Sequence, residues 1–288
     1  MGEVDGKRIV VTGASRGLGR AFAIALAGEG ARLVVNGTNA ALVESLLSEI
    51  RDAGGTASAV VGSVADDGIG ARLVSACVEE FGGVDVVINN AGTVRDRTLL
   101  KMTPEEFDEV IAVNLRGVWS VSRHAASAMQ GSGGLLLQVV SASAFTGSVG
   151  QTNYSASKAG VLGMMYAWDL ELRRYGIRVN ALWPVAQTDM SQVVIDNAVA
   201  RASASDQPVP TPKELGFGSP AEVASVVVYL CSDRASEIRS QLVTFNGSKL
   251  ALWSHPRETW IRRQPSWTID ELDAALKDAA EAVYRIEM

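Results

Sequence analysis

Tyr154 and Lys158 lie four residues apart in the run Asn153-Tyr-Ser-Ala-Ser-Lys-Ala-Gly160. In a helix this spacing places both side chains on the same face. A phenol with a pKa of about 10 is a poor acid–base group at neutral pH. A neighbouring ammonium group favours the phenolate and lowers the phenol pKa, so the pair is suited to general acid–base chemistry. The same spacing also occurs on solvated helices without a catalytic role, and the rest of the chain decides between the two interpretations.

A glycine-rich turn follows the first predicted strand, residues 9–12, and precedes a predicted helix at 18–27. It reads Val11-Thr-Gly-Ala-Ser-Arg-Gly-Leu-Gly19. Glycines at 13, 17 and 19 allow a tight turn and let backbone N–H groups approach a pyrophosphate at the helix N-terminus. A βα turn without a ligand is the alternative interpretation, but the position between strand and helix favours a dinucleotide site.

The end of the second predicted strand bears on which dinucleotide would bind. The segment Val35-Asn-Gly-Thr-Asn39 has no carboxylate to accept hydrogen bonds from a ribose. Arg16, in the glycine-rich turn, matches the geometry of a 2′-phosphate, although it is also explained as a solvated loop residue. The pattern favours NADP(H), with NAD as the alternative.

Short β-branched runs alternate with helical stretches along most of the chain. We expect strands at residues 9–12, 33–35, 57–61, 84–88, 135–140, 177–182 and 242–245, with helices between them. Continuous apolar strands that alternate with helices are typical of a parallel sheet covered on both faces. The fold class is therefore α/β, a single Rossmann-type doubly wound parallel sheet of about seven strands spanning residues 1–247. Asn89-Asn-Ala-Gly92 closes the fourth strand, either at the ligand edge or as an ordinary turn.

Composition excludes several other classes. The 288 residues are 47% hydrophobic and carry a net charge of -6, and scattered Lys and Arg give no footprint for nucleic acid or an anionic membrane. No apolar run reaches the roughly 18 residues of a spanning helix, and the acidic N-terminus is unlike a secretory signal. Cys77 and Cys231 fit core positions of a reducing compartment, and two histidines without a Cys/His cluster give no metal site. A cytoplasmic protein is expected.

Two regions depart from the alternation. Residues 186–219 are rich in Ser, Pro, Asp and Thr, as in a lid over an active site or a plain surface excursion. Residues 248–288 are expected to contribute no strand. They hold a capping box, Thr268-Ile-Asp-Glu271, followed by an apolar face of Leu272, Leu276, Ala279 and Val283. We expect this extension to pack on the body or on a neighbouring subunit.

Taken in order, these motifs together with Asn114 and Ser141 resemble the short-chain dehydrogenase/reductase family from Lys7 to about Gly247. The resemblance implies that Tyr154 exchanges a proton with the substrate oxygen while hydride moves to or from a nicotinamide. It implies that Ser141 hydrogen-bonds that oxygen, that Lys158 lowers the tyrosine pKa and holds the ribose, and that Asn114 organises a water. In the alternative interpretation neither residue is catalytic. Asn114 is then a polar residue at a helix kink, and Ser141 is a serine in the turn at the end of a strand. The implied cofactor contacts are Gly13, Ser15, Arg16, Gly17, Leu18, Gly19, Asn36, Thr38, Ser63, Val64, Asn90, Ala91, Gly92, Tyr154, Lys158, Pro184, Val185 and Thr188.

The chain departs from the family pattern at two places. Ser63 replaces the usual Asp after the third strand, which contacts the adenine of the cofactor in the family. We therefore expect weaker binding of the adenine. Pro184-Val185 replaces the usual Pro-Gly and stiffens the loop beside the nicotinamide.

Four segments narrow the substrate that the resemblance implies. Residues 93–102 and 104–108 are similar to β-ketoacyl thioester reductases and to the (3R)-hydroxyacyl-CoA dehydrogenase unit of multifunctional enzymes. Residues 185–190 and 245–253 lean toward the second group. The resemblance implies a CoA or ACP β-ketoacyl/3-hydroxyacyl thioester as substrate. A hydroxysteroid or general ketone reductase, or a non-catalytic dinucleotide-binding regulator, is the alternative.

The resemblance also implies an assembly of identical subunits, a homodimer or homotetramer. Its subunits would pair through two helices that carry apolar outer positions such as Val118, Trp119, Leu162, Met165 and Trp168. Apolar stripes of this kind are more often part of the chain's own core, so the expected assembly depends mainly on the resemblance.

Overall fold

A computed structural model describes residues 2–205, 207–258 and 260–283, with the side chains of 280–283 left out. The chain divides into two compact units, Met1–Trp253 and Ser254–Met288. The first unit contains the whole sheet and is described first.

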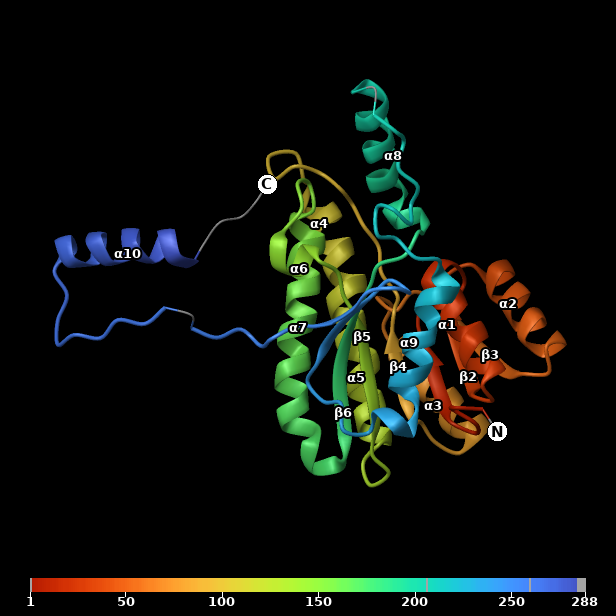
Figure 1. Ribbon diagram of the computed structural model, residues 1–288. Helices are drawn as coiled ribbons and strands as arrows, with labels where there is room; N and C mark the ends of the chain where they lie inside the picture. The colour runs from red at the N-terminus through yellow and green to blue at the C-terminus, as the bar shows by residue number, and fades with distance from the viewer. Residues whose placement is uncertain (1, 206, 259, 284–288) are drawn as a thin grey trace. The chain divides into compact units, whose positions relative to one another are not determined.

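The first unit is built on one eight-stranded sheet in the order β3-β2-β1-β4-β5-β6-β7-β8 (Figure 1). Seven strands are parallel, as the alternation of strands and helices predicts, and their bounds lie close to the expected ranges. They are β1 Arg8–Val11, β2 Arg32–Gly37, β3 Thr56–Val61, β4 Val86–Asn89, β5 Gly134–Val139, β6 Ile177–Pro184 and β7 Leu242–Phe245. The strand order reverses between β1 and β4, which pair side by side, and ligands bind at such switch points.

The eighth strand, β8 Leu250–Leu252, pairs antiparallel with β7 at the sheet edge. The prediction that residues after 247 contribute no strand is therefore wrong. The Asn246 side-chain oxygen accepts hydrogen bonds from the backbone N–H groups of Ser248 at 2.9 Å and Lys249 at 2.6 Å. This Asx turn sends the chain back along β7, and three residues without a β-branched side chain carry too little pattern to reveal it.

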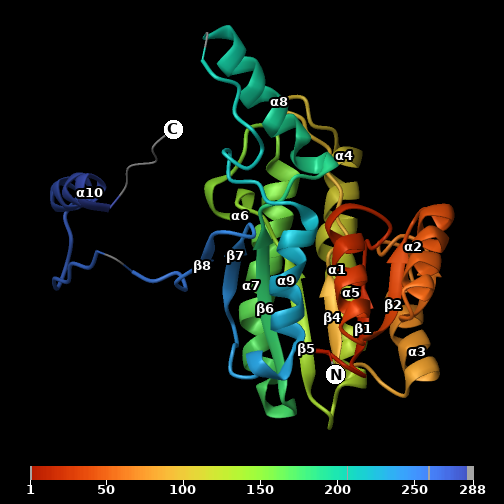
Figure 2. The same cartoon turned by 45° about the vertical axis from the view of Figure 1, so that its right-hand side comes forward.

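Two helical layers cover the sheet (Figure 2). Helices α1 Gly17–Gly28, α2 Ala40–Asp52 and α9 Pro220–Cys231 pack on one face, and α3 Ile69–Phe81, α5 Gly117–Ala128 and α7 Thr152–Leu172 pack on the other. In β1, Ile9 and Val11 face the layer of α1 while Val10 faces the layer of α3. This alternation explains why the strands are apolar on both faces.

The core also corrects the expected subunit contacts. Val118, Leu162 and Met165 are buried in the chain's own core, so they are not outer positions. Trp119 remains 46% exposed. Cys77 and Cys231 are buried and free, as core positions should be.

The expected lid, residues 186–219, is only partly an irregular connection, because it contains helix α8, Asp189–Ala204. The turn into α8 is closed by Ser191, whose hydroxyl accepts a hydrogen bond from the Thr188 N–H at 2.8 Å. In Figure 1 α8 stands above the sheet, at the same end as the glycine-rich turn that follows β1.

The second unit holds helix α10, Ile269–Val283. Its predicted capping box is present: Glu271 accepts from the Thr268 N–H at 2.8 Å, and Thr268 accepts from the Glu271 N–H at 3.3 Å. Leu272 and Leu276 are exposed, and the Val283 side chain lies outside the described residues. No helix in the described ranges is both long and apolar enough to cross a bilayer.

Candidate active site

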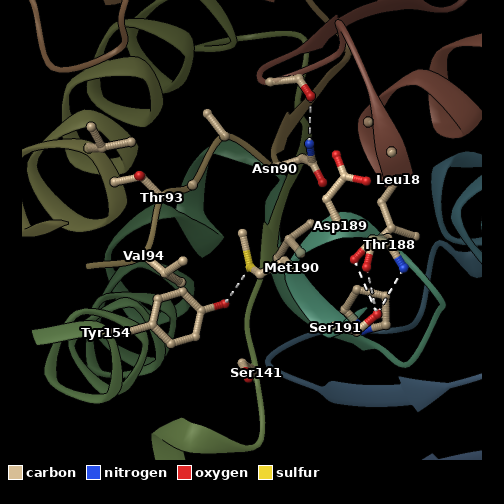
Figure 3. Close-up of a pocket in the computed structure, with 18 of the residues that line it drawn as sticks. Leu18, Asn90, Thr93, Val94, Ser141, Tyr154, Thr188, Asp189, Met190 and Ser191 are labelled. Atoms are coloured by element: carbon tan, nitrogen blue, oxygen red, sulfur yellow. Dashed lines mark hydrogen bonds between the residues drawn. The ribbon is translucent and has the colours of Figure 1, made fainter. Parts of the chain in front are cut away.

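The carboxyl edge of the parallel strands opens into a cavity of about 670 Å³. The glycine-rich turn after β1, the ends of β2 to β6, the start of α7 and the start of α8 form its wall. Every residue expected to contact the cofactor lines this cavity, and so do Ser141, Tyr154 and Lys158. Figure 3 shows Asn90 and Leu18 toward one side of it, and Tyr154 and Ser141 toward the other. Side chains far apart in the sequence therefore share one site.

The glycine-rich turn is held against the end of β4 by Asn90. The Asn90 side-chain amide donates to the carbonyl oxygens of Thr12 at 3.1 Å and Gly13 at 3.0 Å. A Cβ on Gly19 would lie 2.2 Å from the Gly13 oxygen and 2.4 Å from the Asn90 amide, so only glycine fits there. Gly17 instead has a φ of +56°, and a Cβ there would meet only Thr188 Cγ2 at 3.9 Å, an ordinary van der Waals contact. The turn is thus packed closely on the protein side and leaves backbone accessible on the cavity side, which fits a bound pyrophosphate.

The residues at the end of β2 that line the cavity, Asn36, Gly37 and Thr38, include no carboxylate. The Asn36 amide donates to the carbonyl oxygens of Val60 and Gly62, each at 2.9 Å, so its side chain joins β2 to β3 as well as lining the cavity. A Cβ on Gly37 would lie 2.9 Å from Ser15 Cβ. Arg16 is 76% exposed, and its guanidinium lies 3.5 Å from the Asp189 carboxylate.

Tyr154, Lys158 and Ser141 meet at the other side of the cavity. The first two lie one turn apart near the start of α7, and Ser141 follows β5. Lys158 is buried and donates to the Val139 carbonyl oxygen at 2.9 Å, with its Nζ atom 5.6 Å from the Tyr154 ring centre. Anchoring on the end of β5 fixes the ammonium group beneath the phenol.

The pKa of Tyr154 differs from the sequence-based expectation. Burial raises the pKa of Tyr154 to about 12, although a hydrogen bond with Ser141 lowers it and the Asp96 charge raises it further. Burial also lowers the pKa of Lys158 to about 8. The expected lowering of the tyrosine pKa by Lys158 is therefore not found in this structure, because removing the phenol from water disfavours its anion more strongly than its neighbours favour it. The phenol is therefore protonated at neutral pH in this structure.

Asn114 lies in a short π-helix, η1 Ala112–Arg116, between α4 Pro104–Ile111 and α5. Its side chain accepts from the Thr93 N–H at 2.8 Å and donates to the Thr93 carbonyl oxygen at 2.9 Å and to Ser157 at 3.3 Å. Asn114 is fully buried behind the cavity and is not among the residues of its wall. π-Helical turns are frequent at functional sites. This one places the Asn114 side-chain amide between the loop that follows β4 and helix α7.

Sequence reasoning missed the contribution of the first turns of α8. Asp189, Met190 and Val194 line the cavity, and the Tyr154 hydroxyl donates to Met190 Sδ at 3.7 Å. These residues fall in the region expected as a lid, but no motif singles out a methionine or an aspartate there. Only the position of the first turns of α8 at the cavity wall shows their role. In the described ranges, His, Cys, Asp and Glu side chains do not gather in threes as a metal site.

The comparisons with known proteins agree with this site. The family model described as short chain dehydrogenase matches residues 7–198. The chain is a short-chain dehydrogenase. It is 36% identical to hydroxyacyl-CoA dehydrogenase ChsB1 of Mycobacterium tuberculosis, over 96% of this chain and 89% of that protein. It is also 36% identical to the 3-oxoacyl-[acyl-carrier-protein] reductase FabG of Thermotoga maritima, over 85% of this chain and 98% of that protein.

Solved structures give the same result. A short chain dehydrogenase from Mycobacterium avium superposes with a TM-score of 0.83 at 35% identity, covering 99% of this chain and 98% of that one. This short-chain dehydrogenase is therefore an oxidoreductase that binds a nicotinamide dinucleotide and interconverts a carbonyl and an alcohol on a small-molecule substrate.

Proposed function

We propose that this short-chain dehydrogenase interconverts a 3-ketoacyl thioester and the corresponding 3-hydroxyacyl thioester, carried on CoA or an acyl carrier protein. The observation that carries the proposal is the convergence of Tyr154, Ser141 and Lys158 on one side of a cavity whose other side is the glycine-rich turn. The names of two relatives, a hydroxyacyl-CoA dehydrogenase and a 3-oxoacyl-[acyl-carrier-protein] reductase, support a thioester substrate.

The residues divide the chemistry among them. A bound nicotinamide dinucleotide supplies the hydride that adds to the carbonyl carbon in reduction, or accepts it in oxidation. Tyr154 donates its proton to the carbonyl oxygen as the C=O double bond becomes a C–O single bond, so the product is a secondary alcohol. Ser141 positions the same oxygen beside the phenol. In oxidation Tyr154 takes the proton back.

Lys158 and Asn114 support the tyrosine. Lys158 lies 5.6 Å from the phenol ring centre, and its charge favours the tyrosinate that forms when the proton leaves. Asn114 holds the backbone of Thr93, a cavity residue, against α7. It thereby fixes the position of the loop after β4, which forms part of the cavity wall, relative to Tyr154.

We further propose NADP(H) as the preferred cofactor. No carboxylate stands at the end of β2 to bind a ribose, and Gly37 is crowded by Ser15 and Val43. The Arg16 guanidinium is exposed at the cavity wall, where it can pair with a 2′-phosphate. The proposal also includes a homo-oligomer, for which the exposed Trp119 on α5 is a candidate contact.

The test is oxidation of NADPH and of NADH by the purified protein with acetoacetyl-CoA, beside the Tyr154→Phe variant. We expect turnover with NADPH and a loss of kcat of about 10³-fold in the variant, because proton transfer by a positioned side chain contributes about 10²–10⁴-fold. The variant should still bind NADPH. Cofactor binding without turnover of acetoacetyl-CoA, but with turnover of steroid or simple ketones, would overturn the thioester assignment.

A further inference from the structure

Ser143 lies two residues after Ser141, at the start of the short helix α6, Ser143–Thr146. It lines the cavity on the side of Tyr154 and is only 4% exposed. Its backbone N–H donates to the Ser141 hydroxyl oxygen at 3.4 Å. The side chain of Ser143 is therefore next to the group that positions the substrate oxygen.

The Ser143 hydroxyl has no hydrogen-bond partner in the part of the chain that the structure describes. A buried hydroxyl without a partner destabilises a fold, so each one in a native structure calls for an explanation. The hydroxyl of Ser191, in the same cavity wall, instead donates to the Ala186 carbonyl oxygen at 2.9 Å. Alanine at position 143 would remove the unsatisfied group, so packing alone does not explain a serine there.

The position of Ser143 does not depend on its hydroxyl. Phe145, in the same short helix, stacks on Trp253 with ring centres 4.5 Å apart. The Thr146 hydroxyl donates to the Ala142 carbonyl oxygen at 3.3 Å, which closes the turn. Aromatic stacking and the turn thus hold α6 in place, and the buried hydroxyl takes no part in holding it.

The proposed substrate carries a second polar group close to the reacting ketone. In a 3-ketoacyl thioester the thioester carbonyl is two carbons away from the ketone carbonyl. When the ketone oxygen is held by Tyr154 and Ser141, the thioester oxygen must lie within a few ångströms of that pair. A hydroxyl at this distance can donate a hydrogen bond to it.

We propose that the Ser143 hydroxyl donates to the thioester carbonyl oxygen and so selects 3-ketoacyl thioesters over simple ketones. This inference rests on the proposed function. A site that keeps a buried hydroxyl for one substrate group discriminates against substrates without that group, because the hydroxyl then stays unsatisfied. Ser143 would thus be the residue that recognises the second carbonyl.

The test compares two substrates that differ only at the second carbonyl. Acetoacetyl-CoA has it, whereas S-(3-oxobutyl)-CoA, the thioether adduct of methyl vinyl ketone and CoA, has a methylene in its place. For Ser143→Ala we expect kcat/KM with acetoacetyl-CoA to fall about tenfold, and kcat/KM with the thioether to stay unchanged. The backbone hydrogen bond from residue 143 to Ser141 survives this substitution.

Ser58→Ala is the matched control. Ser58, on β3, also has a buried hydroxyl without a partner among the described residues, but it is not a residue of the cavity wall. Both variants should melt at or slightly above the wild-type temperature, and Ser58→Ala should keep both kcat/KM values. An equal loss with the two substrates in Ser143→Ala, or no loss with either, would overturn the assignment of Ser143 alone. Failure of the wild type to reduce acetoacetyl-CoA would overturn the proposed function and this assignment with it.

Discussion

The Tyr154 hydroxyl donates a hydrogen bond to the Sδ atom of Met190, the second residue of α8, at 3.7 Å. Thioether sulfur is a weak acceptor, so a substrate carbonyl can replace it readily. Tyr154 is 8% exposed while Met190 is 48% exposed. The methionine is therefore the more accessible side chain of the pair, and its size limits what can approach the phenol.

Replacing Met190 should change which ketones fit. In Met190→Ala we expect kcat/KM for 2-methylacetoacetyl-CoA to rise about tenfold relative to acetoacetyl-CoA, because one methylene in an apolar pocket changes discrimination by about tenfold or more. Steady-state kinetics with the two substrates measures this ratio. Met190→Leu keeps the volume and should keep the wild-type ratio, and an unchanged ratio in Met190→Ala would show that Met190 does not border the acyl chain.

Ser141 and Tyr154 should act as one unit on the substrate oxygen. We expect Ser141→Ala to lower kcat about 10²-fold, the effect of removing one preorganised donor. Adding Tyr154→Phe to that variant should lower kcat by less than Tyr154→Phe does alone, because residues that act together give non-additive losses. Single-turnover kinetics of the two single variants and the double variant measures the coupling. Fully additive losses would mean that the two hydroxyls act independently.

Arg16 and Asp189 should set the preference for NADPH. We expect Arg16→Gln to lower kcat/KM for NADPH at least about tenfold and to leave NADH nearly unchanged, because it removes a charged partner of the 2′-phosphate. Asp189→Asn should instead raise kcat/KM for NADPH, by about twofold. The gain is modest because the exposed ion pair with Asp189 holds Arg16 only weakly.

The control for this prediction is ionic strength. Added salt should weaken NADPH binding in the wild type and should weaken it less in Arg16→Gln. If Arg16→Gln changed kcat/KM for NADPH and for NADH equally, Arg16 would not determine which cofactor is preferred.

Lys158 should make the stability of the cofactor-free protein depend on pH. Burial lowers its pKa in the folded protein to about 8, below the ordinary value of 10.5, so between these two pH values the unfolded chain binds a proton that the folded chain does not. Raising the pH through this window removes that proton from the unfolded chain, and the free energy of unfolding contributed by Lys158 rises. Below pH 8 both states are protonated and the contribution is constant.

Lys158→Met provides the measurement. We expect the free energy of unfolding of the wild type, relative to Lys158→Met, to increase between pH 7.5 and pH 9.5 by roughly 1–2 kcal/mol. Urea denaturation of both proteins at the two pH values gives this difference. The pH-dependent contributions of groups present in both proteins, such as the buried thiols, cancel in it. A constant difference would mean that Lys158 keeps an ordinary pKa in the fold.

Much of the fold follows from local pattern. Runs such as Leu33-Val-Val35 are apolar on both faces, and only the central strands of a doubly wound sheet need that. Glycine-rich turns and the pair Tyr154 and Lys158 also follow from spacing alone, since each depends on residues that are neighbours in the chain. The seven parallel strands were accessible to sequence reasoning for this reason.

What the sequence did not reveal depends on distant packing. Leu250-Ala-Leu252 becomes a strand because Asn246 turns the chain and β7 offers an edge. The raised pKa of Tyr154 is caused mainly by burial, which a spacing of four residues cannot express. Met190 contacts the phenol because the first turn of α8 borders the cavity, although Met190 is 36 residues from Tyr154 along the chain.

The π-helical turn at Ala112–Arg116 also constrains how this enzyme can change over generations. Deleting one residue there would restore regular α-helical hydrogen bonding from α4 to α5, which favours stability of the helix. The deletion would also remove the wide turn that carries Asn114 and change its position on the helix. Asn114 would then turn away from Thr93 and Ser157. Selection for stability and selection for turnover pull in opposite directions at this turn, and its persistence in a lineage would be a record of activity retained.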